Sequence, residues 1–158
     1  MEVRELWTQP AWVPVVAGWL HEEWFRHAGL TVAELQEQFL PHGVGAPTLP
    51  RTFGGGIAGE VVGAFSLVET PDPESGLPAL CLANLFVAPS QRGRGYGTRL
   101  CLEAAEEARR WHIPQLGLLT VSHAGFYEAL GWQRRGRVPV VSRGVETEAI
   151  FMKLGVYI

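Results

Sequence analysis

The sequence predicts an α/β (α+β) domain, a mixed and mostly antiparallel twisted sheet of about six or seven strands with helices on both faces. Strand-like apolar runs and segments of helical periodicity follow one another in the order β-α-α-β-β-β-α-β-α-β-β. The length of 158 residues and the hydrophobic content of 47% suit one sizeable core. No repeat, low-complexity tract or linker divides the chain, so we expect a single domain over residues 1–158.

The N-terminal part predicts one edge strand and two helices. Residues 3–7 alternate loosely, as a strand does. Apolar residues then recur at helical spacing from residue 12 to residue 20, and Gly29 ends this helix. Thr31 and Glu34 have the spacing of a capping box, which predicts the start of a second, short helix.

A hairpin and a third strand are predicted next. After a loop at 41–47, strands are expected at 48–53 and 60–69, and the glycines at 54–56 suggest a loose hairpin tip between them. A continuous apolar run at 80–87 predicts a buried strand.

The remainder of the chain alternates between helix and strand. An amphipathic helix over about 95–111 leads to a strand at 116–121, and a right-handed crossover makes this strand parallel to the one before the helix. A short helix follows, which Ser122 is expected to cap and Gly131 to end. The closing strand pair is predicted at 133–141 and 146–154.

A turn rich in glycine and arginine joins the apolar strand to the long helix. Its sequence from residue 91 to residue 98 is QRGRGYGT. The first amides of a helix lack internal partners and the helix dipole favours negative charge there, while glycine lets a phosphate approach the backbone closely. One of the two arginines can simply be solvated. The predicted anion site comprises Arg92, Gly93, Arg94, Gly95, Tyr96, Gly97 and Thr98.

Two common phosphate-binding motifs do not fit this turn. A P-loop requires a lysine in the loop, and the only lysine of the chain is Lys153. A dinucleotide fingerprint requires G-x-G-x-x-G, whereas the glycines here run G-x-G-x-G and Thr98 stands where the last glycine would be.

Arg92, Gly95 and Gly97 do fill the pattern of the acyl-CoA loop of the GNAT N-acetyltransferases. The run FYEALGW at 126–132 is similar to that family's F-Y-x-x-L-G-[FW] signature. Segments that resemble its central hairpin and its fifth strand are 59–67 and 116–120. The chain therefore resembles the GNAT superfamily in order along most of its length.

The resemblance implies a fold in which the central parallel strands splay apart and an acetyl-CoA thioester enters the gap. A primary amine of a small molecule or peptide would attack the thioester directly, without a covalent enzyme intermediate. Leu85, Phe86 and Val87 would pair with the pantetheine arm through main-chain groups, and an amide near Phe86 or Val87 would polarise the thioester carbonyl. Thr120 and Phe126 are also assigned to the cofactor site.

The resemblance further assigns Tyr127 as the general acid that protonates the departing thiolate. A phenol with an ordinary pKa of about 10 is protonated at neutral pH and can donate. Many relatives carry a glutamate as general base on the strand before the loop, and this strand has none. The candidates that remain are Glu69, Glu22, His21, His123 and ordered water.

Composition limits the other function classes. A formal charge of −3 argues against broad attraction to nucleic acid or to an acidic membrane surface. The start of the chain does not resemble a signal peptide, so we expect a cytoplasmic protein. Cys81 and Cys101 are expected as buried thiols, and the histidines have no metal-ligand spacing, so no metal is predicted.

The sequence leaves three questions open: which acceptor is used, whether the protein forms oligomers, and whether it turns over a substrate. Family resemblance suggests a homodimer through the C-terminal strands. Arg134, Arg135, Arg137 and Arg143 could attract an acidic group or form a solvated face. Because the expected strand glutamate is missing, the alternative function is a catalytically degenerate acyl-CoA-binding sensor or assembly module.

Overall fold

The computed structural model describes residues 1–40 and 49–157. The strands are β1 Glu2–Glu5, β2 Arg51–Ile57, β3 Glu60–Pro71, β4 Pro78–Val87, β5 Gln115–Thr120, β6 Gln133–Ser142 and β7 Val145–Gly155. The α-helices are α1 Val13–Glu23, α2 Val32–Gln38, α3 Tyr96–Arg110 and α4 Ala124–Glu128. Short 3-10 turns occupy Leu6–Thr8, Phe25–Ala28 and Pro89–Gln91.

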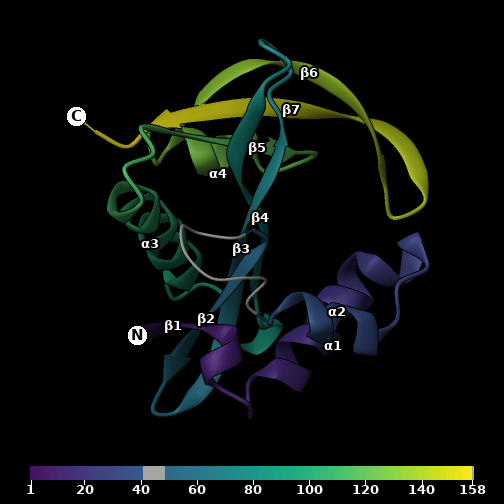
Figure 1. Ribbon diagram of the computed structural model, residues 1–158, viewed down its shortest axis with the longest axis vertical. Coiled ribbons are helices and arrows are strands. Elements are labelled where there is room, and N and C mark those ends of the chain that lie inside the picture. The colour runs from purple at the N-terminus through teal and green to yellow at the C-terminus, as the bar shows by residue number, and fades with distance from the viewer. Residues whose placement is uncertain (41–48, 158) are drawn as a thin grey trace.

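All seven strands join one sheet in the order β1-β2-β3-β4-β5-β7-β6 (Figure 1). Neighbouring strands are antiparallel except β4 and β5, which are parallel. The predicted mixed sheet and its central parallel pair are therefore confirmed.

Helices cover both faces of the sheet, as predicted (Figure 1). Successive residues of a central strand therefore pack against opposite helical layers. On β3, Phe65 packs with α3, whereas Ala64 packs with α1 and α2. Cys81 and Cys101 are buried and free, as expected. None of the helices in the described residues is long and apolar enough to cross a bilayer.

The glycine run of residues 54–56 lies inside β2, so the predicted loose hairpin tip is wrong. The actual turn consists of Ala58 and Gly59, both at positive φ (50° and 83°). The glycines are needed because side chains lie directly on the strand. A Cβ at Gly56 would stand 2.5 Å from the Trp12 ring. Pattern reasoning could not see this contact, since Trp12 is distant in the sequence.

Two of the helix predictions also need adjustment. The first helix does not continue to Gly29: α1 ends at Glu23, and a 3-10 turn follows before Gly29 at φ 77°. The capping box is confirmed, because the Glu34 amide donates to Thr31 Oγ1 at 3.1 Å and the Thr31 amide donates to Glu34 Oε1 at 3.2 Å. The loop predicted at 41–47 lies outside the described residues.

Ser122 does not cap α4, contrary to the prediction. Its hydroxyl bonds to the neighbouring His123 Nδ1 at 2.9 Å. The His123 amide instead donates to Thr120 Oγ1 at 3.1 Å, so the hydroxyl that fixes the entrance to α4 comes from the end of β5.

An ionic cluster ties the β3–β4 loop to the C-terminal hairpin. Lys153 Nζ on β7 lies 2.8 Å from Asp72 Oδ2 and 2.9 Å from Glu74 Oε1. Arg135 on β6 donates two bonds of 3.1 Å to Glu74. Hydrogen bonding to Lys153 lowers the pKa of Asp72, and the two carboxylates raise the pKa of Lys153. The cluster therefore stays fully charged at neutral pH.

Replacing Gly56 by alanine should destabilise the protein by about 1–3 kcal/mol, because the new methyl group must displace the Trp12 ring. The control is Gly18→Ala in α1, where a Cβ meets nothing within 4 Å. That change should stabilise the protein by about 0.5–1 kcal/mol through helix propensity. Urea unfolding followed by tryptophan fluorescence measures both. Equal effects of the two substitutions would contradict the packing explanation.

Candidate active site

The edge of β4 that faces β5 is open over its C-terminal half. The two parallel strands share a single pair, Cys81 with Gly117. A Cβ at Gly117 would stand 3.2 Å from Cys81 Sγ, so the strands are close at this point. Beyond it, β4 continues to Val87 and β5 to Thr120 without further pairing. The expected splay of the central strands is therefore present.

A β-bulge interrupts β4 immediately after this last pair. Ser66 of β3 faces Ala83, yet Ala64 faces Phe86, so β4 contains one extra residue between these positions. Asn84 lies in this extra stretch at φ 55°, a conformation that asparagine tolerates better than most residues. The apolar run at 80–87 predicted a buried strand and gave no sign of this bulge.

The bulge decides which main-chain amides face the gap. The Ala88 amide donates to the Val62 carbonyl of β3 at 2.9 Å. Since alternate residues of an antiparallel strand bond to the same neighbour, the Phe86 amide also faces β3. By the same alternation Leu85 and Val87 present their amides to the open side. Of the two amides predicted to polarise a thioester, those of Phe86 and Val87, only the Val87 amide faces the gap. The Leu85 amide, which was not predicted for this role, also faces it.

The turn after β4 forms the predicted helix N-terminus. Gly93 and Gly95 both have positive φ (80° and 81°), and Gly95 is the residue before the first turn of α3. The first internal helix bond runs from the Arg99 amide to the Gly95 carbonyl at 3.1 Å. The amides of 96–98 therefore have no partner within the helix. A Cβ at Gly93 or Gly95 would meet nothing within 4 Å, so the turn is open to a ligand.

The two arginines of the turn differ. Arg92 Nε donates to the Val87 carbonyl at 2.9 Å, and its guanidinium carbon lies 5.2 Å from the centre of the Phe86 ring. Arg92 thus lies back along the open edge of β4 and holds the turn against the strand. Arg94 is exposed.

Helix α4 meets the turn and the end of β4. A Cβ at Gly97 would stand 3.6 Å from Phe126 Cζ and 3.8 Å from Val87 Cγ2. The Tyr127 ring packs edge-on against Phe126 at 5.1 Å and Trp132 at 5.9 Å. Three predicted parts of the cofactor site, the strand end, the helix N-terminus and the aromatic signature, therefore meet in one place.

Tyr127 has the protonation state that an acid needs. Burial against the core raises the pKa of the Tyr127 phenol above its ordinary value, and the nearby Cys101 adds to this shift. The phenol is therefore neutral at physiological pH.

Thr120 is buried at the end of β5, where its hydroxyl accepts a hydrogen bond from the His123 amide and anchors α4.

The candidate bases lie in different places. Glu22 is on α1 with an exposed side chain, 3.6 Å from Arg26 Nε. The same helix reaches β4. The ring of Trp19 on α1 lies 5.6 Å from the Phe86 ring, and the ring of Trp24, directly after α1, lies 6.2 Å from it. Glu22 is thus carried by a helix that packs on the face of β4 at Phe86.

Glu69 belongs to the other end of the sheet. It pairs with Leu80, and the strand from Leu80 to Leu85 spans roughly 15 Å at the usual rise. Its side chain lines a separate cavity of about 420 Å³ together with Asp72 and Pro114. His123 precedes α4 with its ring bonded to Ser122, and His21 is half-buried on α1.

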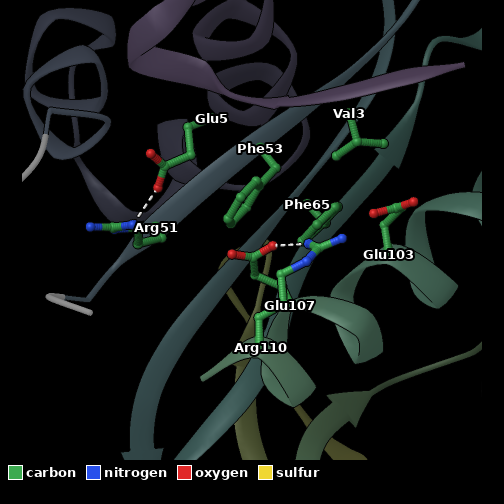
Figure 2. Close-up of a pocket in the computed structure, with 8 residues that line it drawn as sticks. All are labelled: Val3, Glu5, Arg51, Phe53, Phe65, Glu103, Glu107 and Arg110. Atoms are coloured by element: carbon green, nitrogen blue, oxygen red, sulfur yellow. Dashed lines mark hydrogen bonds and ion pairs between the residues drawn. The ribbon is translucent and has the colours of Figure 1, made fainter. Parts of the chain in front are cut away.

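Another cavity, of about 330 Å³, lies between the β1–β3 edge and α3 (Figure 2). Phe53 and Phe65 stack at 4.9 Å and line it. Figure 2 shows the ion pairs beside them, Glu5 with Arg51 and Glu107 with Arg110. Its lining contains no residue of the turn or of α4, so it is separate from the candidate site.

The arginines of the C-terminal hairpin are engaged inside the chain. Their partners are Glu128 for Arg134, Glu74 for Arg135, Glu148 for Arg137 and Glu23 for Arg143. All four arginines are exposed, and each is ion-paired within the chain, an arrangement that neither of the two alternatives described. Within the described residues no group of three or more His, Cys, Asp and Glu side chains could hold a metal ion.

A family model described as "Acetyltransferase (GNAT) domain" matches residues 52–134, which include β4, the turn, α3 and α4. The chain belongs to the GNAT acetyltransferase family. The suspected family is thereby confirmed, and the match covers the residues that meet around the open edge of β4.

Solved structures support the same fold for this GNAT acetyltransferase. An aminoglycoside 6'-N-acetyltransferase complexed with coenzyme A has a TM-score of 0.74 at 20% identity, over 99% of this chain and 97% of that chain. The aminoglycoside 6'-N-acetyltransferase from Enterococcus faecium gives 0.72 at 20% identity over 99% and 97%. A GNAT family acetyltransferase from Elizabethkingia anophelis with acetyl-CoA bound gives 0.53 at 17% identity over 67% and 76%.

A comparison with curated proteins finds no match.

Tyr127 should titrate above the ordinary phenol pKa of about 10, because burial disfavours its phenolate. Ultraviolet titration of the wild type minus Tyr127→Phe isolates this phenol. The difference signal should appear only on the alkaline side of pH ~10. If the titration signal that disappears in Tyr127→Phe has its midpoint at or below pH ~10, the burial of the Tyr127 phenol is contradicted.

Proposed function

We propose that this GNAT acetyltransferase transfers an acetyl group from acetyl-CoA to a primary amine of a small molecule or peptide. The observation that carries the proposal is the continuity of the open β4 edge with the free amides of 96–98, beside a protonated Tyr127. An extended acyl carrier that ends in a diphosphate fits this arrangement, since one part can bind as a strand and the other at a helix N-terminus.

The acyl donor would bind in two sections. Its diphosphate takes the amides of 96–98, with Thr98 and the exposed Arg94 beside them. Its pantetheine arm pairs with the main chain of Leu85 and Val87, as an added strand would. Arg92 must then leave the Val87 carbonyl, and its forked donors become free for the diphosphate.

The reaction is a direct displacement at the thioester. The amine nitrogen bonds to the carbonyl carbon, and the oxyanion that forms is stabilised by the Leu85 amide, a fixed donor that faces the gap. The carbon–sulfur bond then breaks and Tyr127 protonates the thiolate. The proton of the attacking ammonium leaves through Glu22 or ordered water, since Glu69 on β3 pairs with Leu80, too far from Leu85 to receive it.

Two relatives of nearly the same length support a small-molecule acceptor. The aminoglycoside 6'-N-acetyltransferases above align over almost the whole of both chains, including the N-terminal helices. In this chain the half-buried rings of Trp19 on α1 and of Trp24 directly after it pack against Phe86 of β4. The acceptor would therefore enter between α1 and the thioester.

The second candidate function is an acyl-CoA-binding sensor without turnover, favoured by the absence of a carboxylate on β4. Purified protein with acetyl-CoA and a panel of primary amines separates the two. Thiol release that depends on an amine supports the transferase. Tight binding of acetyl-CoA without release by any amine supports the sensor, and absence of binding contradicts both.

Removing the Tyr127 hydroxyl should lower kcat by about 100-fold, the usual contribution of a general acid. The affinity for CoA should hardly change, because Tyr127→Phe keeps the ring that packs against Phe126 and Trp132. Steady-state kinetics and calorimetric titration with CoA measure the two effects. Full turnover by Tyr127→Phe would remove this residue from the mechanism.

Gly95→Glu should weaken CoA binding by roughly 10- to 100-fold, through lost charge-assisted hydrogen bonds of about 1.5–3 kcal/mol. The matched control is Gly144→Glu in the β6–β7 turn. Gly144 also has positive φ (78°) and open surroundings, so both variants carry a similar backbone strain of about 1–2 kcal/mol. If both variants bind CoA equally well, the turn at 92–98 is not the diphosphate site.

A further inference from the structure

A chain of polar side chains crosses three strands directly beneath the β4 bulge. Asn84 Nδ2 donates to Ser66 Oγ at 3.2 Å, and Ser66 Oγ lies 2.8 Å from Thr52 Oγ1. Thr52 and Ser66 are only 5% and 2% exposed. These three residues, one each from β2, β3 and β4, are called the strand-crossing triad below.

The triad lies in an otherwise apolar layer. Ser66 follows Ala64 on the same face of β3, where Ala64 and Phe86 pack with α1 and α2. Buried hydroxyl groups cost free energy unless each finds a partner, so apolar residues would suit this layer equally well for stability alone. Thr52 and Ser66 bond to each other, and Asn84 adds the one bond that joins this pair to β4. The Asn84 side chain makes that bond from the bulged stretch of β4.

The bulge changes the direction of the Leu85 amide. Without the extra residue, the register that pairs Ser66 with Ala83 would continue and pair Ala64 with Leu85. The Leu85 amide would then bond to β3, as the Phe86 amide does now. With the bulge, Leu85 instead presents its amide to the gap between β4 and β5.

We propose, on the basis of the donor site proposed above, that Thr52, Ser66 and Asn84 are positioning residues for catalysis. By holding the β4 bulge, they aim the Leu85 amide at the carbonyl oxygen of the bound thioester. They touch neither donor nor acceptor, and they act through the backbone of Leu85.

Three substitutions break the triad at different points. Ser66→Ala removes the central hydroxyl, and Asn84→Gly removes the amide while keeping positive φ accessible. Thr52→Val removes only the outer hydroxyl, and Thr52→Ser keeps it as the conservative rescue. Thr70→Val is the control, because it deletes another side-chain bond between β3 and β4, 3.0 Å from Thr70 Oγ1 to Cys81 Sγ, outside the bulge.

The expected result is a loss of kcat without a loss of cofactor binding. Ser66→Ala and Asn84→Gly should lower kcat by about 10- to 100-fold, less than complete removal of an oxyanion donor. Thr52→Val should have a smaller effect in the same direction. Thr52→Ser and Thr70→Val should retain wild-type kcat.

A binding comparison distinguishes aiming from simple destabilisation. Calorimetric titration with CoA, acetyl-CoA and S-ethyl-CoA compares ligands with and without the thioester carbonyl. Ser66→Ala and Asn84→Gly should bind CoA and the thioether as the wild type does, and should lose affinity only for acetyl-CoA. A structural role alone would weaken all three ligands together.

The outcomes separate this proposal from the function on which it depends. An active wild type, with unchanged kcat and unchanged ligand preference in both Ser66→Ala and Asn84→Gly, overturns the positioning role alone. An equal loss of affinity for all three ligands also overturns it. A wild type that binds no acetyl-CoA overturns the proposed function and the positioning role together.

Discussion

The hydrogen bonding of the β4 backbone is the constraint on which the site depends. At Cys81 β4 is paired on both sides, with β3 and with β5. After Cys81 its only strand partner is β3, so the main-chain groups on its other edge have no strand partner, and one of them, the Val87 carbonyl, accepts from Arg92 Nε. The strand then runs into the glycine turn, where the amides of 96–98 have no partner within α3. Strand edge and helix N-terminus thus present main-chain groups without a strand or helix partner near one another.

Packing on the two faces of the sheet keeps this surface in place. Small residues on β2 allow Trp12 to lie directly on the strand, which brings the N-terminal layer close to the sheet. Phe86 then contacts Trp19 and Trp24 on one face. On the other face α3 packs against β3 and β4 through a row of small residues that includes Ala104 and Ala108. The backbone of β4 is thus held between these two layers.

Local patterns predicted most of the fold, because strand periodicity, the capping box and the glycine turn are each encoded by neighbouring residues. The glycines of β2 were wrongly predicted to form a hairpin tip. They are required inside the strand by a contact with Trp12, which is far away in sequence. The bulge at Asn84 depends on register, which a single strand does not reveal. Residue type alone could not show where Glu69 lies, since only the sheet pairing places it on β3 opposite Leu80, away from the bulge of β4.

The ionic cluster around Lys153 has a consequence for an enzyme that handles an activated acyl group. Lys153 is the only lysine of the chain, and its side chain is 12% exposed between Asp72 and Glu74. Both carboxylates raise its pKa and keep the nitrogen protonated, without the lone pair that acylation needs. The chain therefore offers its own thioester no accessible ε-amine, and it is protected from self-modification on lysine.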